Sequence, residues 1–139
     1  MPVATRSFQL RTGGDTEVLD ITPQVEQAVR EAGLKNGTAT VFISGSTGGI
    51  TTVEFEPGLQ QDLPEIMEQL VPAGRRYHHD ETWHDGNGHA HLRSALVGTS
   101  FTVPVVDGRL TLGTWQQIVF LDFDNRPRKR EILVQIVGE

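Results

Sequence analysis

The sequence predicts an α+β domain that is built mainly on antiparallel β-strands. Short runs of β-branched and apolar residues recur along the chain, and turns rich in glycine, proline and aspartate separate them. One of these turns is Asp107–Gly108, a dipeptide typical of a two-residue β-hairpin. Two other segments carry apolar residues at helical spacing. Because the 139 residues include no repeat or linker, we expect one domain that spans residues 1–139.

The N-terminal part of the chain predicts two strands followed by a helix. Polar and apolar residues alternate in SFQLRT and again in EVLDI, with Gly13–Asp15 between them, as in two antiparallel strands. Thr22–Pro23 is typical of a helix start, because a proline at the first helical position loses no hydrogen bond. Apolar residues then recur at helical spacing as far as Gly33, which can adopt the left-handed conformation that ends a helix.

The middle of the chain predicts two more strands and a second helix. TATVFIS is typical of a buried strand and ITTVEF of another, and the loop SGSTGG joins them. We expect the helix to begin near Asp62, whose side chain can cap the first turn while Glu65 reaches back to it. Its apolar stripe is expected to be part of the core and consists of Leu63, Ile66, Met67, Leu70 and Val71.

The C-terminal part predicts a short helix and then mostly strands. Two helical turns are expected in HLRSALVG, ending at Gly98. SFTVPVV and RLTL flank the Asp107–Gly108 hairpin, and WQQIVFLDF and REILVQIV flank a second turn at residues 124–127. We expect Trp115 to be an aromatic residue of the core.

Composition excludes several classes of function. The formal net charge of −6 argues against binding to nucleic acid or to an anionic membrane, because the whole molecule repels polyanions. We interpret the basic run RPRKR, residues 126–130, as a solvated hairpin end. The absence of cysteine excludes thiolate chemistry and fits a reducing compartment. No apolar run approaches the ~20 residues of a membrane span, and the N-terminus lacks the apolar core of a signal peptide, so we expect a cytoplasmic protein.

All five histidines lie between Tyr77 and His91, in YHHDETWHDGNGHAH. Imidazole is a frequent metal ligand and carboxylates lie among these histidines, so a metal site or a polar catalytic pocket is one interpretation. Structural histidines and loop caps are the other. A two-residue spacing puts His89 and His91 about 200° apart on a helix, so they could bind one ion only if His89 preceded the helix. His78 and His79 would point apart in a strand, and we expect only one of them at the site.

Three further features are candidates for a substrate site. The loop SGSTGG could bind a phosphate or carboxylate through Ser46, Thr47 and Gly48, although a tight connection between strands explains its glycines equally well. Glu54 interrupts an apolar strand, either as a residue of the solvent face or as a buried acid with a raised pKa. Arg93 could pair with a phosphate or with the end of a helix.

Three long stretches of the chain, DGNGHAHLRSALVGTS, VFISGSTGGITTVE and the C-terminal strands from VPVVDGRLTLGTWQQ onward, resemble the YjbQ family, also called the secondary thiamine-phosphate synthase family. The resemblance extends through nearly the full length. It implies a β-sandwich or barrel-like sheet with a few short helices, assembled as a homotrimer with polar sites near the subunit boundaries. It also implies a weak thiamine-phosphate synthase activity, which joins a pyrimidine methyl pyrophosphate to a thiazole phosphate, and often a metal among the histidines.

Individual residues also resemble positions of the family. His79 is similar to the family histidine after the tyrosine, His91 to the one before the leucine that opens a helix, and Glu54 to the acid after the TT loop. The chain departs from the family at Gly45, where many members carry a histidine. We expect His84 or His89 to replace that missing histidine.

These observations favour an enzyme that uses a divalent metal ion, zinc or magnesium, bound by His79, His84, His89 and His91. In a thiamine-phosphate synthase-like reaction the departing pyrophosphate needs a cation or Arg93 beside it, while Glu54 or Asp85 orients or deprotonates a group. A metal-dependent hydrolase is the first alternative. The second is a non-catalytic trimer that binds a small anion or a protein. In each enzyme hypothesis the partner is a small phosphorylated substrate.

Overall fold

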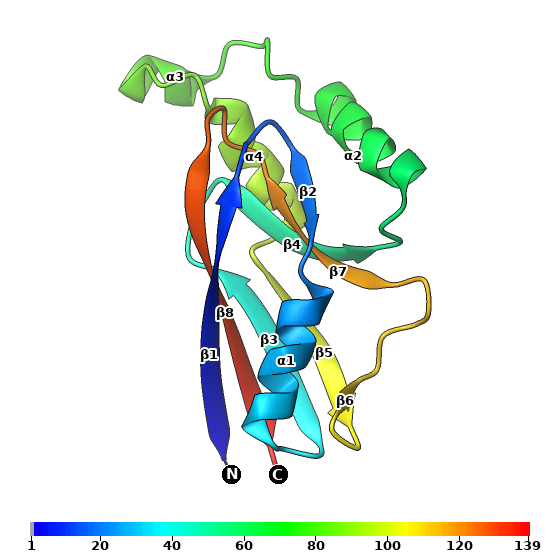
Figure 1. The fold of residues 1–139 in the computed structure, drawn as a ribbon. Helices are drawn as coiled ribbons and strands as arrows, with labels where there is room; N and C mark the ends of the chain where they lie inside the picture. The colour runs from blue at the N-terminus through cyan, green and yellow to red at the C-terminus, as the bar shows by residue number, and fades with distance from the viewer. Residues whose placement is uncertain (1) are drawn as a thin grey trace.

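Two antiparallel β-sheets and four helices make up the fold (Figure 1). The computed structural model describes residues 2–139. Its strands are β1 (Val3–Thr12), β2 (Glu17–Asp20), β3 (Gly37–Ile43), β4 (Gly48–Val53), β5 (Ser100–Val106), β6 (Arg109–Leu110), β7 (Gln117–Asp122) and β8 (Arg128–Gly138). Its helices are α1 (Thr22–Ala32), α2 (Pro57–Leu70), α3 (His78–Trp83) and α4 (Gly88–Val97). The predicted α+β class with mostly antiparallel strands is confirmed.

The strands form one sheet in the order β1-β8-β3-β5-β6 and a second in the order β2-β7-β4. β1 pairs with β8 and β2 pairs with β7, so the first two strands are not partners of one another. Gly14 (φ 82°), Asp15 (φ 53°) and Thr16 (φ 63°) turn the chain from one sheet to the other. β7 and β8 likewise belong to different sheets, and the turn at residues 124–127 connects them.

The hydrophobic core lies between α1 and the strands it contacts, β1, β6, β7 and β8. α1 ends as predicted, because Gly33 has the left-handed φ of 68° and its N–H donates to the Arg30 carbonyl. Its start differs by one residue: Ile21 is the N-cap, and the Thr22 hydroxyl instead accepts a hydrogen bond of 2.8 Å from the backbone N–H of Ile118. The hairpin between β5 and β6 is also confirmed, with Asp107 and Gly108 at φ 51° and 76°.

The prediction for α2 is wrong in two respects. The helix begins at Pro57, and the Glu56 carboxylate caps it by accepting from the N–H groups of Gly58 (2.8 Å) and Leu59 (2.6 Å). Its apolar stripe is core only in part. Ile66 and Leu70 are 43% and 63% exposed, and no residue of the helix is buried. Val71, just beyond the helix, is 7% exposed, and Leu63 and Met67 pack against a small buried cluster. α2 runs along the edge of the molecule rather than across a sheet, so only part of its stripe meets other apolar residues (Figure 1).

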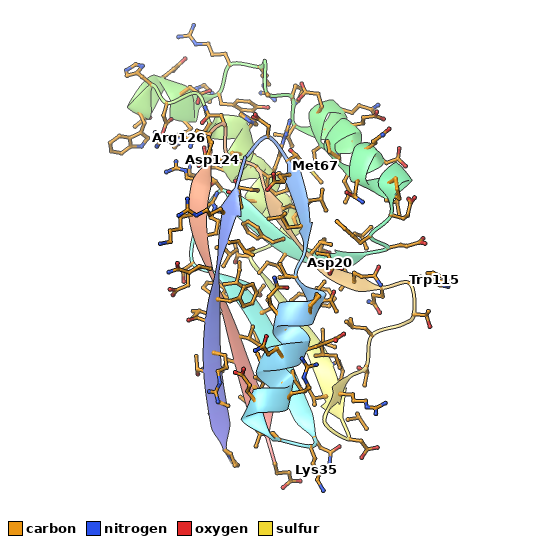
Figure 2. The ribbon with its side chains drawn as sticks, in the orientation of Figure 1. Asp20, Lys35, Met67, Trp115, Asp124 and Arg126 are labelled. Atoms are coloured by element: carbon orange, nitrogen blue, oxygen red, sulfur yellow. The ribbon has the colours of Figure 1, made fainter. Side chains whose placement is uncertain are left out.

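The expectation of a core position for Trp115 is also wrong. This side chain is 73% exposed and projects from the loop between β6 and β7 (Figure 2). The apolar residues that follow it in β7 are instead fully enclosed within the single chain. Within residues 2–139, every helix is too short or too polar to serve as a transmembrane segment.

Candidate functional site

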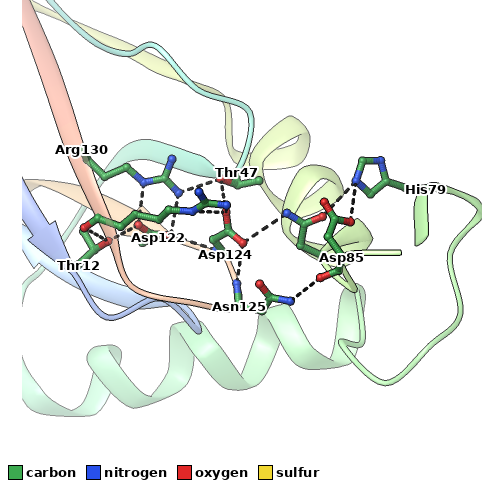
Figure 3. A network of polar contacts seen from close by, with 10 residues as sticks. Thr12, Thr47, His79, Asp85, Asp122, Asp124, Asn125 and Arg130 are labelled. Atoms are coloured by element: carbon green, nitrogen blue, oxygen red, sulfur yellow. Dashed lines mark hydrogen bonds and ion pairs between the residues drawn. The ribbon is translucent and has the colours of Figure 1, made fainter. Parts of the chain in front are cut away.

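A continuous network of polar side chains runs from β1 to α3, at the end of the molecule that carries α3 and α4 (Figure 3). Its centre is the pair Asp122 and Asp124, which are 0% and 1% exposed. Arg130 Nε lies 2.8 Å from Asp122 Oδ2, and Arg128 Nη2 lies 2.9 Å from Asp124 Oδ2. Because Asp122 ends β7, Asp124 follows it and both arginines belong to β8, these ion pairs join the two sheets.

The basic run at residues 126–130 is therefore only in part the solvated turn that we predicted. Arg126 and Lys129 are exposed, whereas Arg128 and Arg130 turn inward to the aspartates. The alternation of side chains along β8 explains the difference, since residues 128 and 130 share a face and residue 129 lies on the other.

Asp124 is ionised at neutral pH. Burial alone would raise the pKa of this carboxyl, but hydrogen bonds from the Asn125 N–H and the Asn87 amide and the charge of Arg128 lower it below its ordinary value. The carboxylate also accepts a hydrogen bond of 3.1 Å from the Thr47 hydroxyl. Because the Asp124 carboxylate is both buried and charged, it has to be surrounded by hydrogen-bond donors.

The loop that contains Thr47 reaches this network directly. The Thr47 hydroxyl donates to Asp124 and accepts a hydrogen bond of 2.8 Å from Arg130 Nη2, so its polar capacity is already used within the protein. Gly48 is needed for packing, because a Cβ there would lie 2.6 Å from the Phe120 ring. Ser46 is exposed. A tight connection between strands thus accounts for Gly48, while Ser46 remains accessible to a ligand.

His79 and His91 are brought together, as their match to the family led us to expect. His79 comes from α3 and His91 from α4, and their ring centroids are 4.2 Å apart at an interplanar angle of 49°. Burial lowers the pKa of His91, and the neighbouring His79 lowers it further. His91 is therefore neutral at pH 7 and able to accept a proton.

Asn87 occupies a position between two carboxylates. One end of its amide group lies 3.1 Å from His79 Nε2 and 2.9 and 3.2 Å from the Asp85 carboxylate oxygens. The other end lies 3.4 Å from Asp124 Oδ1. An amide has donors at one end only, so its oxygen faces a carboxylate whichever way it is turned. Asp124 already accepts from the Asn125 N–H, the Thr47 hydroxyl and Arg128, so in the protein without a cation the NH₂ end is better placed toward Asp85, where it donates to both carboxylate oxygens.

A cation beside Asp85 would favour the opposite orientation, in which the Asn87 amide oxygen faces Asp85 and His79. His79 Nε2, Asp85 Oδ1 and Asn87 Oδ1 are separated from one another by 2.9 to 3.5 Å. Ligands at about 2.1 Å from one ion lie about 3.0 to 3.4 Å apart in octahedral or tetrahedral geometry. No three His, Asp or Glu side chains within residues 2–139 are placed to hold a metal ion without help. The amide oxygen of Asn87, turned toward Asp85, could supply a third ligand.

The four-histidine metal site that we predicted is not formed. α4 begins at Gly88, so His89 and His91 both lie within the helix and point about 200° apart. His89 is 5% exposed, and its pKa is lowered by burial and then by Arg93. His84 ends α3 in a left-handed conformation (φ 58°) and is exposed. Neither joins His79 and His91, so the expected replacement for the family histidine at Gly45 is wrong.

Arg93 and Glu54 also lie apart from this network. Arg93 is 4% exposed; its Nη1 donates to the Thr16 hydroxyl, Nη2 to Glu68 and both Nε and Nη2 to the Val71 carbonyl. These bonds tie α4 to the end of α2, and we assign Arg93 a structural role. Glu54 is exposed rather than partly buried, because it lies just beyond the end of β4.

The larger hollows of the surface lie to the side of the histidine pair. A cavity of about 490 Å³ lies between α1 and the β6–β7 loop, at a distance from α3 in the fold (Figure 1). A shallow depression beside α3 is lined by Arg76, Asp80, Glu81 and His84. We base the candidate site on the arrangement of polar atoms, because neither hollow is lined by His79 or His91.

Three residues of the network were missed by sequence reasoning: Asn87, Asp122 and Asp124. The signal for the aspartates was their alternation with Phe123 directly before a basic run with the same two-residue spacing. Such a pattern is typical of two strands whose charged faces meet. The sequence does not show whether the aspartates and the basic run lie opposite one another. Asn87 gave no signal beyond its position among the histidines.

The comparison with known families agrees with this architecture. The model of the family described as "UPF0047 protein YjbQ-like" matches residues 6–139. The chain belongs to this family. A UPF0047 protein of Archaeoglobus fulgidus is 44% identical over 126 residues, which cover 91% of this chain and 95% of the relative. The UPF0047 protein YugU of Bacillus subtilis is 36% identical over 96% of this chain and 98% of its own length.

Solved structures of similar proteins have the same fold. A hypothetical protein from Aeropyrum pernix K1 superimposes with a TM-score of 0.91 at 37% identity, over 98% of this chain and 99% of that protein. A YbjQ-like protein of unknown function from Sulfolobus solfataricus P2 gives a TM-score of 0.90 at 34% identity, over 99% of this chain and 100% of that protein. The fold is thus shared with the family.

Proposed function

We propose that this UPF0047 protein is a divalent-cation-dependent enzyme that acts on a small phosphorylated substrate. The observation that carries the proposal is the convergence of His79 Nε2, Asp85 Oδ1 and one end of the Asn87 amide, which lie 2.9 to 3.5 Å from one another. A cation turns the same arrangement into three convergent ligands.

Each residue of the proposed site would have a separate role. His79 Nε2, Asp85 and Asn87 Oδ1 would hold the ion, and Asp124 would hold the Asn87 oxygen toward it by accepting from the NH₂ end. A bound divalent ion would neutralise the negative charge that develops on a phosphate or pyrophosphate. In the alternative of hydrolysis, neutral His91, beside His79, would accept a proton from the attacking water.

The specific reaction that we propose is thiamine-phosphate synthase-like. The bond from the pyrimidine methyl carbon to pyrophosphate breaks, and a new bond forms between that carbon and the thiazole nitrogen. The resemblance to the family suggests this reaction, and a cation site suits the loss of pyrophosphate because a bound ion would neutralise the charge of the leaving group. The thiazole nitrogen attacks through its lone pair and loses no proton, so this reaction needs no base.

Hydrolysis of a phosphate ester is the second candidate. The side chains of His79 and Asp85 are 29% and 43% exposed, so water has free access to the site. A transferase that must protect a reactive intermediate is usually closed to water. Incubation with both thiamine precursors and, separately, with a panel of phosphate esters distinguishes the two reactions by their products.

The cation site is tested by metal content. We expect purified protein dialysed against zinc or magnesium to retain about one ion per chain, and His79→Ala and Asp85→Ala to lose it. His78→Ala is the control, because His78 is fully exposed and forms only a long contact with Glu81. His91→Ala should reduce activity with a smaller effect on folding. If His79→Ala keeps a stoichiometric ion, or if wild type binds none, the histidines are structural and a non-catalytic binding module becomes the better explanation.

We also propose a homotrimer, as the resemblance to the family implies. The strand β7 offers no apolar surface for association, because it is enclosed within the chain. Other large apolar side chains support association, since Trp115, Trp83, Leu96 and Leu70 are between 63% and 73% exposed. Light scattering should give a mass near three chains, and a monomer at micromolar concentration would contradict the proposal.

A further inference from the structure

We infer that the loop of residues 44–47, together with Arg130, is a binding site for a phosphate group. The inference deepens the proposed function, on which it rests, by assigning the part of the protein that would bind the phosphorylated end of the substrate. Three independent features of the loop and its surroundings carry it.

The first feature is a run of free backbone donors. Within residues 2–139, the N–H groups of Gly45, Ser46 and Thr47 have no hydrogen-bond acceptor in the protein. These three residues lie between the end of β3 and the start of β4, outside either ladder. Successive N–H groups in a bend of this kind form a concave site for the oxygens of an anion. The exposed hydroxyls of Ser44 and Ser46 add two more donors.

The second feature is an arginine that is held in place with one nitrogen left free. Arg130 Nε and Nη2 bond to Asp122, and Nη2 also bonds to Thr47. Its guanidinium lies over the Phe120 ring, 5.9 Å from the centroid, and the side chain is 10% exposed. Nη1 has no acceptor within residues 2–139, yet it is not among the buried unpartnered atoms, so solvent reaches it. An arginine fixed in this way loses little entropy when it binds a phosphate.

The third feature is the absence of a side chain at residue 45. A Cβ added to Gly45 would lie 3.3 Å from Arg130 Nη1, so any larger side chain would cover this nitrogen. Gly45 does not have a left-handed φ, and the conformation of the backbone therefore does not require glycine here. Gly48 and Gly49 differ, because a Cβ at either would collide with Phe120 or Val97. Glycine at position 45 therefore leaves Arg130 Nη1 accessible.

The charges around the loop favour binding of an anion by direct contact rather than by long-range attraction. Arg128 and Arg130 are matched by Asp122 and Asp124, so the ion-paired network attracts anions weakly over long distances. Direct hydrogen bonds from the loop and from Arg130 would therefore supply most of the affinity. The network also connects this site to the cation site, since Thr47 bonds to Asp124 and Asp124 to Asn87 (Figure 3).

The test is calorimetric titration with inorganic phosphate in a buffer that contains a chelator, so that the result does not depend on the cation site. Wild type should bind phosphate. Gly45→Glu should weaken binding at least tenfold, because the glutamate carboxylate would pair with Arg130 Nη1 and block its contact with phosphate. Gly74→Glu is the matched control: it adds the same charge at an exposed glycine with nothing within 4 Å of its Cβ position, and it should stay within twofold of wild type.

Unchanged binding in Gly45→Glu, or equal losses in the two variants, would overturn the inference, as would the absence of binding to wild type. Both variants are first compared with wild type in thermal unfolding. If Gly45→Glu does not fold, Ser46→Ala takes its place, with a smaller expected loss of about threefold. Metal content at His79 is measured on the same samples. A loss of phosphate binding with metal content unchanged would show that the loop site, rather than the cation site, was altered.

Discussion

The two ends of this molecule are stabilised in different ways. At one end, α1 closes over the five-stranded sheet and buries residues such as Val25, Val41 and Ile136 completely. At the other end, α3 and α4 meet the sheets around buried ion pairs, and no residue of α2 or α3 is buried. Apolar packing thus stabilises the scaffold. The polar end buries fewer apolar side chains, and its ion pairs position charged and ligating groups. The following predictions test this division.

The largest effect is expected from removal of Asp122. Asp122→Ala leaves the buried guanidinium of Arg130 without its counter-ion, which should cost about 3–5 kcal/mol of unfolding free energy. Urea denaturation measures this loss. Arg6→Ala is the control, because the Arg6–Glu31 pair is exposed and should contribute less than about 1 kcal/mol. Similar small losses in both variants would mean that the polar end does not depend on its ion pairs.

The second effect compares apolar residues of the two ends. Ile136→Ala creates a cavity in the core and should cost about 2–5 kcal/mol, because this side chain is 0% exposed. Leu70→Ala in α2 should change the unfolding free energy by less than about 0.5 kcal/mol in the monomer, since the side chain is 63% exposed. A large loss in Leu70→Ala that depends on protein concentration would place α2 in a subunit interface.

A third prediction concerns pH. Burial, and then Arg93, lower the pKa of His89 below its ordinary value of 6.5. The unfolded chain therefore takes up a proton at this position more readily than the folded one, and stability is lost as the pH falls below about 6.5. The urea midpoint of chelator-treated protein should drop between pH 7.5 and pH 5.5, and the drop should be smaller in His89→Met. His78→Ala serves as the control and should behave as wild type; a drop of equal size in His89→Met would exclude His89 as the cause.

The smallest effect is expected at the start of α2. Glu56→Ala removes the carboxylate that accepts from Gly58 and Leu59, and loss of such a cap costs about 0.5–2 kcal/mol. Because α2 has few buried contacts, the loss should be confined to the helix. Hydrogen exchange should accelerate in residues 58–62 and stay unchanged in α1. Acceleration in both helices would show that α2 is coupled to the core more strongly than its exposure suggests.

Local sequence determined the elements whose signals act over short distances. The left-handed end of α1 at Gly33, the hairpin at Asp107–Gly108 and the strand β3 were all predicted, because each depends on backbone conformation or on the pattern of neighbouring residues. β3 is buried on one face only, since Phe42 is 38% exposed. The pairing of His79 with His91 was also expected, although from resemblance to the family rather than from spacing. These features need no knowledge of what lies opposite them.

Only the tertiary structure decided which segments face one another. The stripe of α2 has the same apolar pattern as a buried helix, but its exposure depends on the course of the chain after β4. The carboxylates of Asp122 and Asp124 bind Arg130 and Arg128 because β7 and β8 belong to different sheets that meet at this turn. Asn87 became a candidate ligand because the fold places its amide between Asp85, His79 and Asp124, the last of which is 37 residues away in the chain. Long-range contacts of this kind carry no local signal, since the energy that forms them depends on residues far apart in the sequence.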